Sequence, residues 1–97
     1  MTMMTRRVIK ESAQFRKDYK KSKKQGKNTD LLEDVIELLA SDKPLPPKYN
    51  DHDLKGNWRG YRECHITPDW LLIYTKREDG KLLLALARLG SHSDLRF

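Results

Sequence analysis

Apolar and polar positions in the second half of the chain follow the two-residue period of β-strands. Three strands are predicted, over residues 57–66, 70–76 and 81–89. Within the first strand, Arg62, Cys64 and Ile66 fall on one face, whereas Glu63 and His65 fall on the other. The third strand is almost wholly apolar, which predicts a place inside the sheet.

Two short polar segments are typical of hairpin turns between these strands. Thr-Pro-Asp at 67–69 joins the first pair, because proline presets its own φ angle and Asp can bond to nearby backbone groups. Asp-Gly at 79–80 is a hairpin signal for the second pair. The first turn therefore brings the imidazole of His65 towards the carboxylate of Asp69.

The first half of the chain has the three-to-four-residue apolar spacing of helices. The predicted elements are a strand at 7–10, a helix at 13–25, a helix at 30–40 and a proline-rich connector at 44–47. On the first helix, Phe15 and Tyr19, extended by Ser22, form a narrow apolar stripe, so this helix packs on one side only. The second helix has a broader apolar face and belongs to the core.

The order β-α-α-β-β-β predicts an α+β fold in which a helical hairpin packs on a twisted antiparallel sheet. A chain of 97 residues suits one small domain, over 1–97. The sheet face away from the helices has fewer residues to cover it. It is therefore a candidate binding surface.

Basic charge is concentrated at the start of the chain. Residues 1–28 carry ten Lys or Arg and two acidic residues, a net of +8, whereas the rest carry ten basic and twelve acidic residues, a net of −2, giving +6 in total. The first helix contributes a lysine ridge, made of Lys20, Lys21, Lys23 and Lys24. Such a surface indicates a polyanion such as nucleic acid, an acidic protein partner, or a solvated helix face.

Other features indicate a cytoplasmic protein without membrane contact. The chain contains no apolar run of membrane-spanning length, and its first residues lack the apolar segment of a signal peptide. Its one cysteine, Cys64, cannot form an internal disulfide, which fits a reducing compartment.

The candidate chemistry rests on three histidines and one carboxylate: His52, His65, His92 and Asp69. Motifs such as a glycine-rich phosphate loop, Cys-x-x-Cys or His-Glu-x-x-His do not occur. A zinc site from these four residues would lack the short paired spacing typical of structural zinc, so we predict no metal. Metal-free acid–base chemistry is the alternative, because histidine gives and takes protons near neutral pH.

Cleavage of RNA suits this equipment, because the ribose 2′-hydroxyl supplies the nucleophile. The protein then needs a base for that hydroxyl, an acid for the leaving 5′-oxygen and a cation for the phosphorane. Arg62 or Arg88 could supply the cation. Trp70 or Phe97 could stack on bases.

Residues 51–74 (DHDLKGNWRGYRECHITPDWLLIY) and 88–95 (RLGSHSDL) strongly resemble the YafQ branch of the RelE-like toxins. Weaker similarity extends over the helix pair and the proline connector. The resemblance implies a compact α+β fold of the microbial-RNase type. It also implies a toxin of a bacterial type II toxin–antitoxin system.

The same resemblance implies ribosome-dependent cleavage of mRNA by 2′-hydroxyl attack, with neither metal nor cofactor. His52, His65, Asp69 and His92 would be the catalytic residues. An acidic, DinJ-like antitoxin would neutralise the toxin, and their complex would bind operator DNA.

One position departs from the family pattern. The family usually places Phe four residues after the final histidine, where this chain has Arg96 and Phe97 follows one residue later. Either Phe97 still reaches the RNA, which we favour, or Arg96 replaces the aromatic ring, since arginine planes also stack on bases.

The expected roles follow from this set. His52 or His65, with Asp69, would form the base side, His92 would be the acid, and the lysine ridge would hold ribosomal RNA. A non-catalytic RNA-binding or ribosome-binding inhibitor of translation is the alternative. A third hypothesis is a partner-binding protein whose lysines meet an acidic antitoxin.

Overall fold

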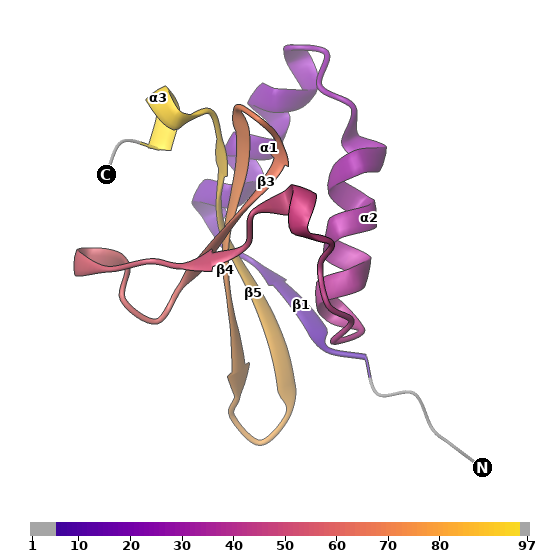
Figure 1. Cartoon of the computed structure of the whole chain (residues 1–97), viewed down its shortest axis with the longest axis vertical. Coiled ribbons are helices and arrows are strands. Elements are labelled where there is room, and N and C mark those ends of the chain that lie inside the picture. The colour runs from indigo at the N-terminus through magenta and orange to yellow at the C-terminus, as the bar shows by residue number, and fades with distance from the viewer. Residues whose placement is uncertain (1–5, 96–97) are drawn as a thin grey trace.

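The computed structural model describes residues 6–95 of the chain (Figure 1). Arg96 and Phe97, on which the C-terminal stacking expectation rests, lie outside the described residues. The strands are β1 (Val8–Glu11), β2 (His52–Asp53), β3 (Arg62–Thr67), β4 (Trp70–Glu78) and β5 (Leu82–Gly90). The helices are α1 (Ala13–Lys24), α2 (Thr29–Ala40) and α3 (His92–Leu95), with 3₁₀ turns η1 (Pro47–Tyr49) and η2 (Gly56–Trp58).

The strands form one five-stranded sheet in the order β1-β5-β4-β3-β2. The meander β3-β4-β5 is antiparallel, as predicted, and the α+β fold class is confirmed. The expectation of a wholly antiparallel sheet is wrong, because β1 pairs with β5 in parallel, with Ile9 opposite Leu84. No hairpin joins the first and last strands, so no turn constrains their relative direction.

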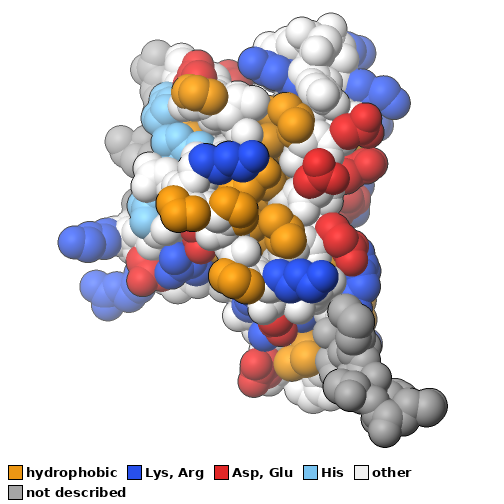
Figure 2. Space-filling view, turned by 45° about the vertical axis from the view of Figure 1, so that its right-hand side comes forward, with side chains coloured by type: hydrophobic (Ala, Val, Ile, Leu, Met, Phe, Trp, Pro, Cys, Tyr) orange, Lys and Arg blue, Asp and Glu red, His pale blue; other side chains and the backbone are white. Residues whose placement is uncertain are grey.

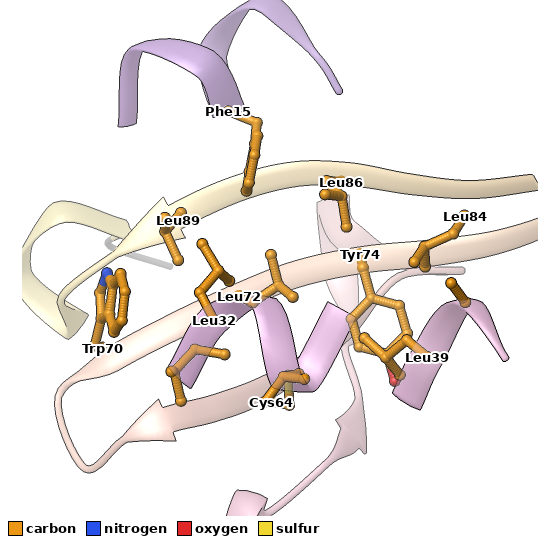
Figure 3. Packing of buried hydrophobic residues seen from close by; sticks show 13 residues of the cluster. Phe15, Leu32, Leu39, Cys64, Trp70, Leu72, Tyr74, Leu84, Leu86 and Leu89 are labelled. Atoms are coloured by element: carbon orange, nitrogen blue, oxygen red, sulfur yellow. The ribbon is translucent and has the colours of Figure 1, made fainter. Parts of the chain in front are cut away.

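Both helices cover the same face of the sheet, where the main core lies (Figures 1 and 3). Ser12 caps the N-terminus of α1, since its hydroxyl accepts a hydrogen bond from the Phe15 amide at 2.9 Å. Asn28 caps α2 in the same way, through the Asp30 amide at 3.0 Å. The core is built from alternate residues of the central strands and from the helix faces. Its members include Phe15, Leu32, Leu39, Cys64, Trp70, Leu72, Tyr74, Leu84, Leu86 and Leu89.

The opposite face of the sheet carries a smaller apolar cluster. Leu71, Ile73 and Leu95 are buried there, and Leu54 and Trp58 pack against them. This face is therefore covered in part, by η2 and α3.

The first predicted strand starts later than its pattern indicates. Residues 57–61 lie in η2 and the turn after it, and β3 begins only at Arg62. Gly56 and Gly60 have φ angles of 66° and 91°, which fall in the left-handed region and interrupt an extended chain. The alternation beyond that point is correct: Cys64 and Ile66 face the main core, whereas Glu63 and His65 face away from it.

The described residues include no helix that is both long enough and apolar enough to cross a membrane.

Candidate active site

The four predicted catalytic residues come from separate elements that meet at one end of the sheet. His52 lies in β2, His65 in β3, Asp69 in the β3–β4 turn and His92 at the start of α3. Strand pairing places Glu63 opposite His52 on one side of β3. On the other side, Leu71 lies opposite both His65 and Gly90, the last residue of β5 and two positions before His92. The sheet register therefore brings chain positions 40 residues apart into one site.

The three imidazoles form a row with His65 in the middle. Its ring centroid lies 6.2 Å from that of His52 and 5.5 Å from that of His92. In Figure 2 the histidine side chains lie along one side of the molecule, next to an apolar patch. The predicted convergence of the histidines is thus present in the described structure.

Asp69 forms a dyad with His92. One carboxylate oxygen, Oδ1, accepts the His92 backbone N–H at 2.9 Å and lies 2.7 Å from the ring Nδ1. The backbone hydrogen bond first, and then the ring hydrogen bond, lower the pKa of Asp69, so the carboxylate is ionised at neutral pH. Because an ionised carboxylate only accepts, Nδ1 of His92 carries a proton and Nε2 is left for substrate. The structure thus pairs Asp69 with His92, whereas the expectation grouped it with His52 or His65, and its catalytic role stays a prediction.

Glu63 is a site residue that the sequence reasoning did not select. It is only 6% exposed, and its Oε1 lies 3.5 Å from Nε2 of His52 and 3.8 Å from Nε2 of His65. Its other oxygen, Oε2, is buried without a hydrogen-bond partner among residues 6–95. The available signal was the strand alternation, which places this carboxylate on the same face as His65, two residues before it.

Arg62 lies on the other face of β3, so its predicted role as the phosphate-binding cation is not supported. Its Nη2 lies 3.0 Å from Oδ2 of Asp51, and its Nη1 donates to Asp53. Asp51 also accepts the hydroxyl of Tyr74 at 2.6 Å. Hydrogen bonding to Asp51 raises the pKa of Arg62 above its usual range. Arg62 therefore belongs to a cluster on the helix side of the sheet.

Arg88 forms an ion pair with Asp18 at the edge of β5, so its predicted role at the phosphorane is also not supported. Its Nε donates to Oδ2 of Asp18 at 2.8 Å, and the Leu89 backbone N–H donates to the same oxygen at 3.0 Å. The pairing of β1 with β5 ends at Leu86. Beyond that point, the Asp18 carboxylate of α1 accepts the hydrogen bond from the β5 backbone at Leu89. Burial raises the pKa of Asp18, but hydrogen bonds from Arg88, Leu89 and Gln14 outweigh this effect and lower it.

Trp70 is part of the core, and its predicted role in stacking on bases is corrected. The residue is 1% exposed, and its indole N–H donates to the hydroxyl of Ser22 at 3.1 Å. A ring that is enclosed on both faces offers no surface to a nucleobase. The same hydrogen bond explains why the apolar stripe of α1 ends in a serine.

A hollow of about 530 Å³ adjoins His65 between α2, η1 and the β3–β4 turn. Tyr49 lies in its wall, with Nζ of Lys48 5.1 Å from the centre of the Tyr49 ring. The lining residues are Leu31, Lys48, Tyr49, His65, Ile66, Thr67 and Pro68. This hollow offers an aromatic ring and a cation next to the histidine row.

The lysine ridge is exposed along α1, as predicted. One member also reaches the histidine end of the molecule, because Nζ of Lys21 lies 3.0 Å from Oδ1 of Asp94 in α3. The basic surface and the Asp69–His92 dyad are thus joined through a short helix.

Within residues 6–95, no group of three or more His, Cys, Asp or Glu side chains is arranged to hold a metal ion. The prediction of a metal-free site stays a prediction.

Comparison with known proteins decides the family. The model of the family described as "Bacterial toxin of type II toxin-antitoxin system, YafQ" matches residues 7–97. The chain belongs to the YafQ toxin family. The resemblance drawn from residues 51–74 and 88–95 is thereby confirmed.

Relatives of known sequence and structure agree with this assignment. The mRNA interferase toxin YafQ of Escherichia coli (strain K12) is 41% identical over 93 residues, which cover 95% of this chain and 98% of that protein. The crystal structure of the E. coli DinJ–YafQ toxin–antitoxin complex contains a chain with a TM-score of 0.84 and 40% identity, covering 95% of this chain and 99% of that one. A metal-bound toxin from Helicobacter pylori has a TM-score of 0.82 and 46% identity, covering 96% of this chain and 99% of that one.

Proposed function

We propose that this chain is the toxin of a type II toxin–antitoxin system and an endoribonuclease that cleaves mRNA on the ribosome. The observation that carries the proposal is the row of three histidines with the Asp69–His92 dyad at one end. The E. coli relative named mRNA interferase supports the same activity. Ribosomes place such a reaction in the cytoplasm.

The reaction needs only groups that the site contains. A base removes the proton from the ribose 2′-hydroxyl, the oxygen attacks the adjacent phosphorus, and an acid protonates the departing 5′-oxygen, which leaves a 2′,3′-cyclic phosphate. The attacking and departing oxygens lie on opposite sides of the phosphorus, so base and acid must flank it. Neighbouring imidazoles with centroids 5.5 Å apart, those of His65 and His92, provide such a pair.

The Asp69–His92 dyad fits the acid. Asp69 fixes the ring so that Nε2 is directed at substrate, and it stabilises the imidazolium that donates the proton. The His92 side chain is 59% exposed, so it can reach a bound phosphate. His65, partly buried in the middle of the row, fits the base.

The surrounding surface fits a single-stranded message. A base next to the scissile phosphate would lie in the hollow beside His65, where Tyr49 and Lys48 offer stacking and positive charge. The lysine ridge would bind ribosomal RNA through its phosphates, without regard to sequence.

The deciding experiment compares cleavage of a ribosome-bound message with that of the same message free in solution, each with and without chelator. We expect cleavage on the ribosome and no effect of chelator. The metal-bound toxin from H. pylori makes the chelator arm informative. Loss of cleavage in chelator would contradict the metal-free mechanism, and an intact message on the ribosome would contradict the nuclease.

A non-catalytic inhibitor of translation is the second candidate, supported by the exposed lysine ridge. Mapping the 5′ ends of messages after induction separates the two. Stalled but uncut messages support the inhibitor, whereas new 5′ ends within codons support the nuclease.

The partner is an acidic antitoxin similar to DinJ, which forms a complex with the E. coli toxin. The lysine ridge offers it a complementary surface, so antitoxin and ribosome would compete. The toxin–antitoxin complex would bind operator DNA.

The role of the lysine ridge predicts a change in salt dependence. Replacing Lys20, Lys23 and Lys24 by Ala should weaken ribosome binding and lower the slope of log K against log salt, by about 0.7 for each phosphate that the variant no longer neutralises. Lys21 is kept because it pairs with Asp94. The control is Lys81→Ala, in the β4–β5 turn, which should leave the slope unchanged. Equal slopes for the triple variant and the wild type would contradict this role.

A further inference from the structure

We propose that Glu63 is a positioning residue for the rings of His52 and His65. It shares a proton with Nε2 of His52, so that His52 is not the base, and it orients His65 so that Nδ1 of that ring is the base. The inference rests on the proposed nuclease function and deepens it. It is carried by the burial of one carboxylate, by the hydrogen bond between His52 and the Asn50 carbonyl, and by the distances from the carboxylate to the two rings.

The first observation is that the carboxylate of Glu63 is buried. Glu63 is 6% exposed and lies between His52 on one side of β3 and the buried Ile73 on the other. A buried carboxylate needs compensating partners, because burial strongly disfavours its charge. Among residues 6–95, its ion-pair partners within 4 Å are the Nε2 atoms of His52 and His65, so the compensation comes from the active site itself.

The second observation fixes the proton on His52. Its Nδ1 lies 2.7 Å from the backbone carbonyl oxygen of Asn50, and a carbonyl oxygen only accepts, so Nδ1 carries a hydrogen. Nε2 of the same ring then faces Oε1 of Glu63 at 3.5 Å. Without a proton between them, two lone pairs would face each other in a buried place. One proton is therefore held by this pair, and His52 does not serve as the base.

The third observation orients His65. Its Nε2 faces the same carboxylate oxygen at 3.8 Å, which is too long for a hydrogen bond but close enough for the negative charge to favour the neutral ring with its hydrogen on Nε2 and its lone pair on Nδ1. When Nδ1 takes the proton of the 2′-hydroxyl, the ring becomes an imidazolium next to Glu63, which stabilises the new charge. Within residues 6–95, Oε2 is buried without a hydrogen-bond partner, so both imidazoles face the carboxylate through Oε1.

The charged groups around this pair come from each neighbouring element. They are His52 from β2, His65 from β3, and His92 from α3, whose ring meets that of His65 and whose charge is balanced by Asp69 of the β3–β4 turn. Glu63 is therefore shared by the imidazoles of His52 and His65, whereas the neighbouring imidazole of His92 has a separate carboxylate, that of Asp69.

The wild-type protein provides the first test, which does not depend on activity. Nitrogen-15 spectra of the histidine rings should show a hydrogen on Nδ1 of His52 and, in the neutral form of the His65 ring, a hydrogen on Nε2. A His65 ring with its hydrogen on Nδ1 would overturn the proposal. Because the spectra need no substrate, this outcome is separate from a failure of the nuclease assignment.

Three variants provide the second test, scored under single-turnover conditions on ribosome-bound message. Glu63→Gln keeps shape and removes charge, and its rate should fall at least about tenfold with little change in KM. The loss should fall on the rate rather than on KM, because the imidazolium that His65 becomes during the reaction loses the stabilising carboxylate. Glu63→Asp keeps the charge and should recover part of the rate.

Glu63→Leu is the control for a purely structural role, since leucine suits the apolar surroundings. It should be folded, by its far-ultraviolet dichroism and unfolding midpoint, and as slow as Glu63→Gln. Wild-type rates in either variant would overturn the proposal. If Glu63→Gln does not fold, the comparison of Glu63→Leu with the wild type and the nitrogen-15 spectra still decide it.

Discussion

Replacement of His92 by alanine is expected to reduce message cleavage by about 10²–10⁴-fold, the usual contribution of a positioned acid or base. His92 is well exposed on α3, and its ring bonds to Asp69 rather than to the core, so its removal should leave the fold intact. The measurement is the single-turnover rate on ribosome-bound message, together with growth arrest after induction.

Two further variants separate the loss of the acid from a disturbance of α3. Ser93→Ala, also exposed on α3 and next in sequence, should cleave at the wild-type rate. Asp69→Asn should be slow as well, because the amide can present its nitrogen to His92 Nδ1 and disturb the orientation of the ring. Full activity in a variant that lacks both His92 and Asp69 would contradict the assigned dyad.

Replacement of Asp18 by alanine is expected to lower the free energy of unfolding by about 3 kcal/mol, as for other buried ion pairs that lose one partner. Asp18 is 7% exposed and accepts hydrogen bonds from Arg88, the Leu89 amide and Gln14. Denaturant unfolding of Asp18→Ala, Arg88→Ala and the double variant measures the coupling. Additive losses would contradict a specific pair.

The pH dependence of stability gives the same carboxylate a second readout. The pKa of Asp18 is lower in the folded chain than its usual value of 3.8. Its contribution to stability is therefore present above pH 3.8 and is lost as the pH falls through the folded value. Asp18→Asn, which no longer titrates, should lose less stability than the wild type over that acid range.

The sequence predicted most of the fold because its patterns are local. The alternation around Cys64 and His65 assigned the two faces of β3 correctly, and the apolar spacing placed α1 and α2. β2 and α3 were missed, because two and four residues are too short to show a period. The parallel pairing of β1 with β5 joins strands from opposite ends of the chain, and a local pattern in the sequence carries no information about such a contact.

The site was predicted in part, and the errors have a common cause. The histidines and Asp69 were identified by type and resemblance, which do not specify partners. Trp70 lies in a stretch where both strand faces are apolar, so its burial could not be told from alternation. Arg88 was available as a phosphate-binding cation in the sequence because nothing there shows its ion pair with Asp18, which lies 70 residues away.

The single cysteine has a practical consequence. Cys64 is completely buried on the core side of β3, and burial raises the pKa of its thiol well above the usual range. The thiolate is the form that reacts with alkylating probes, so Cys64 should not react with them at neutral pH. A cysteine introduced at an exposed position such as Ser93 would then be the one labelled, and a fluorophore there would report movements of α3 without any change to the core.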